Sequence, residues 1–156
     1  MVLVFDLDDT ICETDIYSEN YIKYFIYKEN LPYRQIATST RFAERKFDWP
    51  MEVALAWYKT YGDRMMLEFP CKAGAREVLR KLHDEGHTIV ISTARDTDWH
   101  TRPKQITKQW LKNNGIVYDM LICGRTDKET VCKEVHADVF VDHDITNTNK
   151  VATYFA

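Results

Sequence analysis

The sequence lacks the features that would indicate a membrane, secreted or disulfide-stabilised protein. No apolar run among its 156 residues approaches bilayer-spanning length, and the N-terminus lacks the basic stretch and long apolar core of a secretory signal. The four cysteines are scattered, without a CxxC pair or a zinc-ligand spacing. We therefore expect a cytoplasmic protein with reduced thiols.

The sequence also lacks a surplus of positive charge, internal repeats and low-complexity tracts. Its formal net charge of -3 argues against broad electrostatic binding to nucleic acid or to an anionic membrane. A hydrophobic fraction of 45% and a charged fraction of 29% are ordinary for a soluble globular protein. The length predicts one domain, with room for an insertion.

Short apolar runs and helical patterns alternate along most of the chain. The runs, each typical of a buried strand, cover residues 2–5, 88–92, 120–122 and 139–141. The helical patterns between them cover residues 75–85, 104–113 and about 128–135, the last with Asp127 as a candidate N-cap. Continuously apolar strands that alternate with helices predict a three-layer, Rossmann-like α/β fold, with a parallel sheet covered on both faces.

Chemically capable side chains follow all four predicted strands. They are Asp6 and Asp8, then Ser92 and Thr93, then Gly124, Arg125 and Lys128, and finally Asp142 and Asp144. The ligand crevice of such a sheet lies at the carboxyl ends of its strands. The clustered aspartates of FDLDDT would repel one another unless a cation lay among them, and Mg²⁺ fits because it prefers hard oxygen ligands. A carboxylate there can attack phosphorus, and a lysine and a hydroxyl can stabilise the transferring group.

Four segments resemble the motifs of the haloacid dehalogenase superfamily, whose members are predominantly Mg²⁺-dependent phosphatases. FDLDDT at 5–10 is similar to its DxDxT signature, and ISTAR at 91–95, TDKETVCKEV at 126–135 and ADVFVDHD at 137–144 follow in the family's order. The resemblance spans residues 1–11 and 69–144, so only the segment between these ranges is unmatched.

The resemblance implies roles for the first and third motifs. Asp6 is expected to be the nucleophile, with one oxygen on Mg²⁺. Asp8 is expected to be the general acid that protonates the leaving group and the base that then activates water, and its backbone carbonyl is expected to bind the metal. Thr10 is expected to hold the loop after the first strand through its hydroxyl and to belong to the substrate-binding residues. Lys128 is expected to reach Asp6 and the phosphate.

The second motif leaves a choice between two hydroxyls. Thr93 matches the family pattern of an apolar strand, Thr, a small residue and Arg, and Ser92 is its rival because predicted boundaries can slip by one residue. Arg95 is expected either to contact the substrate or to form a surface ion pair.

The fourth motif departs from the family's usual pair of aspartates. Asp142 ends the strand directly, so we assign it to the metal. Asp144 is a candidate for the second acidic role. His143 is a poor Mg²⁺ ligand, and we expect it outside the ligand set or at the surface.

The segment 12–68 is predicted to be a small α-helical cap inserted into a core formed by residues 1–11 and 69–156. It is rich in aromatic residues, which can stack on a nucleobase or form the cap's own core. Its basic residues can face a phosphorylated substrate or solvent. They are Arg34, Arg41, Arg45 and Lys46.

These observations together predict a Mg²⁺-dependent phosphomonoester phosphatase that forms an aspartyl phosphate and acts on a small phosphorylated metabolite. Similarity to small bacterial and phage nucleotidase-like members favours a nucleoside monophosphate, with a sugar phosphate as the nearest alternative. A phosphoacceptor signalling domain would lack Asp8 as a turnover acid and would not need the cap. A catalytically silent binding protein is disfavoured because the motif residues are intact, namely Asp6, Asp8, Lys128 and Asp142.

Overall fold

The computed structural model of the chain describes residues 1–39 and 42–156 and contains a four-stranded parallel sheet in the order β3-β2-β1-β4. The strands are β1 (Val2–Asp6), β2 (Thr88–Thr93), β3 (Met120–Cys123) and β4 (Val139–Val141). The chain starts in the centre of the sheet, and β2 pairs with β1 so that Asp6 lies beside Ser92. The carboxyl ends of the strands therefore meet at one edge.

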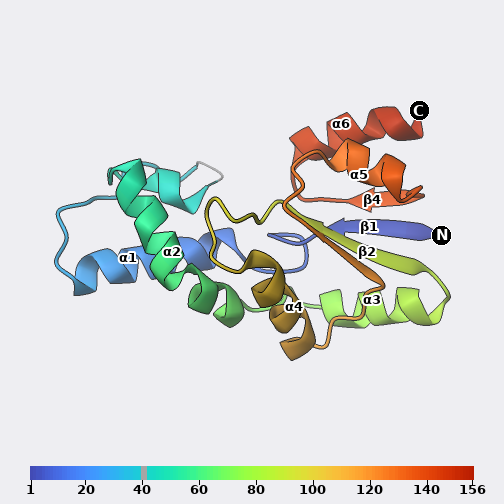
Figure 1. Cartoon of the computed structure of the whole chain (residues 1–156), viewed down its shortest axis with the longest axis horizontal. Coiled ribbons are helices and arrows are strands. Elements are labelled where there is room, and N and C mark those ends of the chain that lie inside the picture. Colours follow the sequence, from blue (N-terminus) through green and yellow to red (C-terminus); the bar gives the residue numbers. More distant parts are fainter. Residues whose placement is uncertain (40–41) are drawn as a thin grey trace.

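The helices in the described part of the chain are α1 (Asp15–Lys28), the short 3₁₀ helix η1 (Ala43–Lys46), α2 (Met51–Glu68), α3 (Ala75–Asp84), α4 (Pro103–Asn113), α5 (Lys128–Glu134) and α6 (Ile145–Phe155). Helices α3 and α4 lie on one face and α5 and α6 on the other (Figure 1). The predicted three-layer α/β architecture is confirmed.

Alternation along the strands divides the apolar side chains between two clusters. Leu3, Ile89 and Ile91 join the cluster beneath α3 and α4, together with the fully buried Trp110. The residues between them point to the opposite face, where Val4 and Val90 pack with residues of α5 and α6. Because successive residues of a strand face opposite sides, a strand buried on both faces must be apolar throughout.

The C-terminal tail forms helix α6, whereas the sequence pattern did not predict a structure for this tail. Asp144 caps α6 by accepting a hydrogen bond from the backbone N–H of Thr146 at 2.7 Å. Val151 is buried against the second cluster. The tail therefore completes one face of the sheet and fixes the loop that follows β4.

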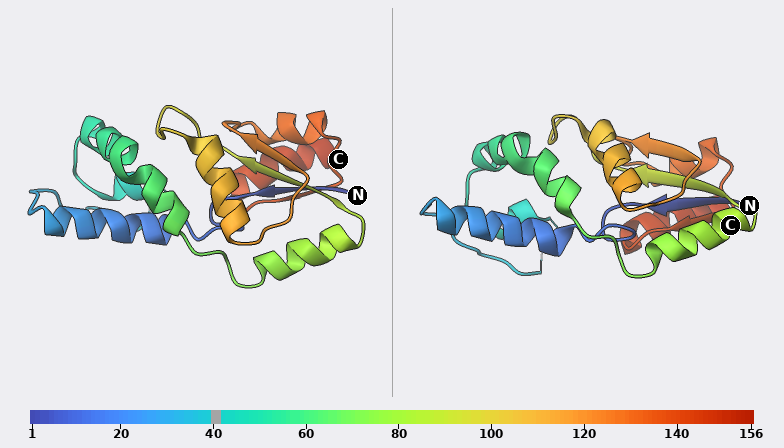
Figure 2. Two further views of the ribbon diagram at one scale, coloured as in Figure 1. Left: turned by 60° about the horizontal axis from the view of Figure 1, so that its bottom comes forward. Right: turned by 90° about the horizontal axis from the view of Figure 1, so that it is seen from below.

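The segment between β1 and α3 extends to one side of the sheet (Figures 1 and 2). Its two connections to the sheet run antiparallel: Lys72 donates its backbone N–H to Ile11 O at 2.8 Å, and Glu13 donates to Pro70 O at 2.9 Å. Lys59 on α2 donates to the carbonyl of Thr97, in the loop after β2. This contact holds α2 near the carboxyl ends of the strands. The boundaries of a separate cap domain stay a prediction.

No helix within the described part of the chain is both long enough and apolar enough to cross a lipid bilayer.

Candidate active site

The carboxylate of Asp6 lies at the centre of the strand ends, with Lys128 beside it. The Nζ of Lys128 is 3.1 Å from Asp6 Oδ1, and Lys128 also donates to the backbone carbonyl and the hydroxyl of Ser92, at 2.6 and 3.2 Å. Both charged side chains are more than nine-tenths buried. Asp127 caps α5 by accepting from the N–H of Thr130, and this helix start aims Lys128 at β1. A buried, oriented carboxylate with a cation beside it is suited to receive a phosphoryl group.

Asp142 and His143 bring two further side chains to Asp6. Nδ1 of His143 lies 3.4 Å from Asp142 Oδ1 and 3.7 Å from Asp6 Oδ2. Hydrogen bonds to Asp142 and Asp6 raise the pKa of His143 to about 9. The imidazole is therefore charged at neutral pH, and it partly neutralises the two carboxylates.

The two carboxylates fit a divalent cation. Asp6, Asp142 and His143 each offer one ligand atom, and these three atoms lie within 4.8 Å of one another. The carboxylate of Asp142 is held in place because Oδ1 accepts from the N–H of Asp144 and Oδ2 accepts from Nδ2 of Asn147, both at 2.8 Å. Two fixed carboxylates supply the hard oxygens that Mg²⁺ prefers, and the rest of its coordination can be water.

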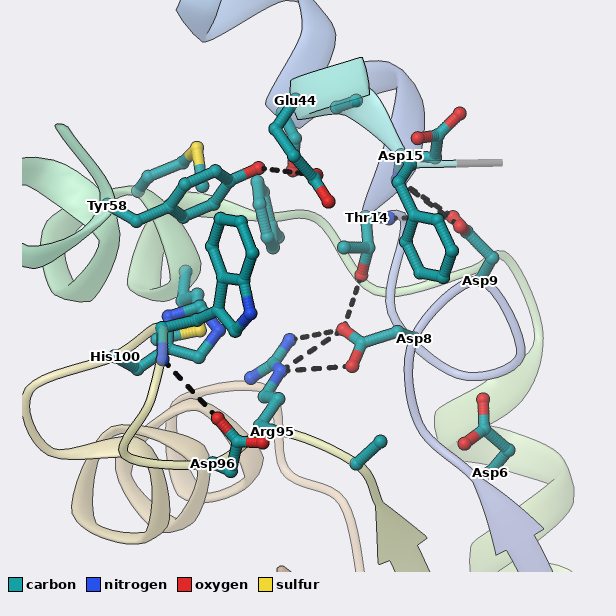
Figure 3. A pocket seen from close by; sticks show the side chains of 18 of the residues that line it. Asp6, Asp8, Asp9, Thr14, Asp15, Glu44, Tyr58, Arg95, Asp96 and His100 are labelled. Atoms are coloured by element: carbon teal, nitrogen blue, oxygen red, sulfur yellow. Dashed lines mark hydrogen bonds and ion pairs between the residues drawn. The ribbon is translucent and has the colours of Figure 1, made fainter. Parts of the chain in front are cut away.

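Asp8 lies next to this cluster, where its half-buried carboxylate pairs with the buried guanidinium of Arg95 (Figure 3). Nη2 of Arg95 is 2.6 Å from Asp8 Oδ1, and Nε lies 3.1 Å from both carboxylate oxygens. Asp8 also accepts hydrogen bonds from the hydroxyls of Thr14 at 2.7 Å and Thr93 at 3.3 Å. Burial raises the pKa of Asp8, but the charge and hydrogen bonds of Arg95, with Thr14, outweigh it and lower the pKa overall.

Solved structures share this fold. A haloacid dehalogenase-like family hydrolase from Streptococcus pneumoniae is 13% identical, with a TM-score of 0.63 over 97% of this chain and 80% of that chain. A haloacid dehalogenase-superfamily hydrolase from Geobacter sulfurreducens is 13% identical, with a TM-score of 0.61 over 94% and 81%. This chain has the haloacid dehalogenase-like fold.

Other structures with this fold carry more specific names. A predicted phosphoglycolate phosphatase from Haemophilus somnus is 16% identical, with a TM-score of 0.57 over 89% of this chain and 75% of that chain. A haloacid dehalogenase-like hydrolase from Bacillus subtilis, described as bound to magnesium, is 15% identical, with a TM-score of 0.52 over 83% and 66%. No protein-family model matches the sequence. No curated protein is similar enough to match.

The remaining residues of the four motifs connect the loops that follow the strands. Thr10 accepts a hydrogen bond from the backbone N–H of His143 at 3.1 Å, which ties the loop after β1 to the loop after β4. Asp9, the third aspartate of FDLDDT, accepts from the N–H groups of Thr14 and Asp15 at the start of α1. The hydroxyl of Thr93 contacts Asp8, whereas that of Ser92 contacts Lys128. The roles assigned to these residues stay predictions.

A cavity of about 250 Å³ opens from Asp6 and Asp8 toward the inserted segment. Glu44 of η1 and Tyr58 of α2 lie at its far end (Figure 3). The loop after β2 contributes the side wall with Arg95, Asp96, Trp99 and His100, among other residues. Burial lowers the pKa of His100 to about 4, so this imidazole is neutral near pH 7.

Most of the inserted segment's aromatic residues pack against one another. Trp57 lies with its ring centre 5.9 Å from that of Trp49 and 6.0 Å from that of Phe25. Tyr58 and Phe42 also line the cavity. The aromatic residues thus form mainly the core of the segment, and Tyr58 belongs to that core and to the cavity wall at once.

The described basic residues among the four predicted to face substrate or solvent have other partners or are exposed. Lys46 is buried and pairs with Asp15 and Glu19, both at 2.7 Å. Arg45 lies over the ring of Phe42, and Arg34 is exposed. Arg41 lies outside the described residues.

Sequence reasoning missed several residues that orient the site. Asn147 fixes Asp142 from the first turn of α6, and the cap signal of Asp144, the third residue after the fourth strand, could have indicated that helix. The position of His143 between two carboxylates and the Arg95–Asp8 pair carry no local sequence signal, because they depend on how loops from different strands meet.

Proposed function

We propose that this protein is a Mg²⁺-dependent phosphomonoester phosphatase in which Asp6 is the nucleophile. The observation that supports it most is the convergence of Asp6, Lys128 and Asp142 from three separate strand ends onto one buried point. The fold supports the same conclusion, because structures named as hydrolases and phosphatases share it. Mg²⁺ would be held by Asp6, Asp142 and the backbone carbonyl of Asp8. It would offset the negative charges of the phosphate and of these carboxylates, which otherwise repel one another.

In the first step an Asp6 oxygen attacks phosphorus, an O–P bond forms, and the bond from phosphorus to the leaving oxygen breaks. Lys128 stabilises the negative charge on the transferring group. A protonated Asp8 gives its proton to the leaving oxygen. Arg95 opposes that protonation, but an incoming phosphate places a second negative charge beside Asp8 and favours its neutral form.

In the second step Asp8, now ionised, takes a proton from water as the water oxygen attacks phosphorus. Inorganic phosphate leaves and Asp6 is restored. The buried setting of Asp6 and the Arg95 contact keep both carboxylates in fixed positions for both steps.

A small phosphorylated metabolite fits the cavity, and we propose a nucleoside monophosphate as the substrate. Support comes from the apolar and aromatic surfaces that Tyr58, Trp99 and Phe69 present next to the catalytic cluster. A sugar phosphate is the alternative within the same reaction.

Hydrolysis of p-nitrophenyl phosphate tests the reaction. We expect turnover with Mg²⁺, none in excess EDTA, and none in Asp6→Asn. The matched control is Asp84→Asn, which changes an exposed aspartate at the end of α3 and should behave as wild type. Turnover that is unaffected by EDTA or by Asp6→Asn would overturn the proposal.

A further inference from the structure

The cavity beyond the catalytic carboxylates has a distinct charge pattern. Among the described residues that line it, each cationic group already has an anionic partner: Arg95 pairs with Asp8, and His143 lies between Asp6 and Asp142. The nearby Lys46 is paired with Asp15 and Glu19. A leaving group with its own anionic group would therefore enter a region rich in carboxylates.

Glu44 is an acidic residue at the far end of this cavity, and its backbone and its carboxylate each accept a hydrogen bond. Its backbone carbonyl accepts a hydrogen bond from Trp49 Nε1 at 2.9 Å. Its carboxylate accepts one through Oε2 from the hydroxyl of Tyr58 at 3.4 Å. Tyr58 is itself only 7% exposed, so the pair is anchored in the core of the inserted segment.

The walls between Asp6 and Glu44 are largely apolar. Met65, Met66 and Phe69 line the cavity from α2 and the residue that follows it, and Trp99 lines it from the loop after β2. Polar side chains also line this end of the cavity, among them Thr14, Asp15 and Ser18, so Glu44 is one of several hydrogen-bonding groups there. Apolar and aromatic walls with a few polar groups are typical of a site for a flat, uncharged ring system. A carboxylate is an acceptor only, and its two oxygens can take two parallel N–H donors.

We propose that Glu44, positioned by Tyr58, selects the leaving group of the phosphatase by accepting hydrogen bonds from a pair of adjacent N–H donors on a planar, uncharged ring. Among nucleotides this pattern is the Watson–Crick edge of guanine, with its ring N–H and exocyclic amino group, so the matching substrate is a guanosine monophosphate. The inference rests on the proposed function and adds the identity of the leaving group. It also disfavours phosphomonoesters whose leaving group is anionic, such as phosphoglycolate.

Comparison of kcat/KM for GMP, IMP and AMP tests this selection. IMP keeps the ring N–H and lacks the amino group, while AMP presents a donor beside an acceptor. Because a hydrogen bond to a charged group discriminates by roughly 10- to 100-fold, GMP should exceed IMP by about that factor, and AMP and phosphoglycolate by more.

Glu44→Gln gives the sharper test, because an amide offers one donor and one acceptor, the complement of adenine. The ratio of kcat/KM for GMP to kcat/KM for AMP should fall by at least roughly tenfold, which means that the preference shifts from GMP toward AMP. Tyr58→Phe removes the hydroxyl that donates to the Glu44 carboxylate and should lower this ratio by a smaller factor than Glu44→Gln does. The matched control Glu52→Gln alters an exposed glutamate at the start of α2 and should leave the ratio unchanged.

The outcomes separate this inference from the proposed function. If p-nitrophenyl phosphate is hydrolysed with Mg²⁺ but GMP and AMP react equally, or Glu44→Gln leaves their ratio unchanged, Glu44 is not a specificity residue and the phosphatase proposal stands. If no phosphomonoester is hydrolysed, both fail. If Glu44→Gln does not fold, as judged by circular dichroism, an unchanged ratio in Tyr58→Phe overturns the inference.

Discussion

The buried guanidinium of Arg95 and the half-buried carboxylate of Asp8 form a bidentate ion pair across the loops that follow β1 and β2, with Nη2 2.6 Å from Oδ1. Arg95 also donates through Nη1 to the hydroxyl of Thr107 on α4, at 3.2 Å. One side chain therefore links the candidate acid–base group to the helical layer beneath the sheet. Removing Asp8 would leave the buried Arg95 guanidinium without its charged partner, and removing Arg95 would leave the half-buried Asp8 carboxylate unpaired at the cavity.

Arg95→Met should lower the free energy of unfolding by about 1–3 kcal/mol, because the half-buried Asp8 carboxylate loses its charged partner and the hydrogen bonds from Arg95. Urea denaturation measures the change. The double variant with Asp8→Asn should recover part of the loss. Arg76→Met is the control, since Arg76 is exposed and its pair with Glu77 should be worth less than about 1 kcal/mol. Equal losses in Arg95→Met and Arg76→Met would contradict a structural role for the Arg95–Asp8 pair.

Lys128→Met should reduce kcat for p-nitrophenyl phosphate by roughly 10²- to 10³-fold, because the variant lacks the ammonium that lies 3.1 Å from Asp6 Oδ1. Lys133→Met removes a lysine from the exposed side of the same helix, where it pairs with Glu129, and should retain the wild-type rate. Steady-state assays at saturating Mg²⁺ compare the two. A Lys128→Met enzyme with half of the wild-type kcat would show that this ammonium does not act in the reaction.

His143→Ala should increase the stabilisation that Mg²⁺ gives. In the metal-free protein the charged imidazole lies between Asp6 and Asp142 and offsets their repulsion. Without it the carboxylates repel more strongly, so the metal-free protein is less stable and gains more from a divalent cation. The rise in Tm on adding Mg²⁺ measures this gain, with His83→Ala, a surface histidine near Asp119, as the control. A smaller rise in His143→Ala would identify His143 as a metal ligand.

The stability of the inserted segment should fall as the pH drops below about 4.5. Hydrogen bonds from Lys23 and Lys46 lower the pKa of Glu19 from 4.5 to about 2. A carboxyl group with a depressed folded-state pKa contributes stability that is fully present above its unfolded value and is lost as pH falls through the folded value. The loss should therefore run from about pH 4.5 to about pH 2.

Glu19→Gln removes this dependence, so its Tm should vary less over the same pH range and should lie below that of wild type at pH 7. Glu29→Gln, at the exposed end of α1, should follow the wild-type curve. Parallel curves for Glu19→Gln and wild type would rule out this contribution.

The layered fold could be predicted from sequence because its cause is local. Val4 and Val90 face one helical layer while Leu3 and Ile89 face the other, so both strands must be apolar throughout, and that pattern is visible in the residues. The observed strands differ from the predicted ones by one residue, at Asp6, Thr93 and Cys123. Polar side chains at these positions continue the backbone pairing after the apolar run has ended.

The details of the candidate site could not be predicted because they depend on contacts between distant segments. The direction of Arg95 depends on the loop after β2, which Lys59 and Arg102 tie to α2. Glu44 reaches the cavity only because η1 lies against α1 and Tyr58. The sequence shows which residues follow each strand, but it does not show which loop packs on which helix.

Locating the phosphoryl group on the phosphorylated enzyme tests most directly whether Asp6 is the nucleophile. The Asp8→Asn variant, which lacks the base for the second step, is mixed with Mg²⁺ and p-nitrophenyl phosphate, whose leaving group departs without a proton from Asp8. The protein is then quenched in acid and digested, and its peptides are analysed by mass spectrometry. The account predicts one added phosphoryl group on the peptide that contains Asp6, and none when Asp6→Asn is added to the same chain. A phosphoryl group on another residue, or full turnover with none detectable on Asp6, would contradict it.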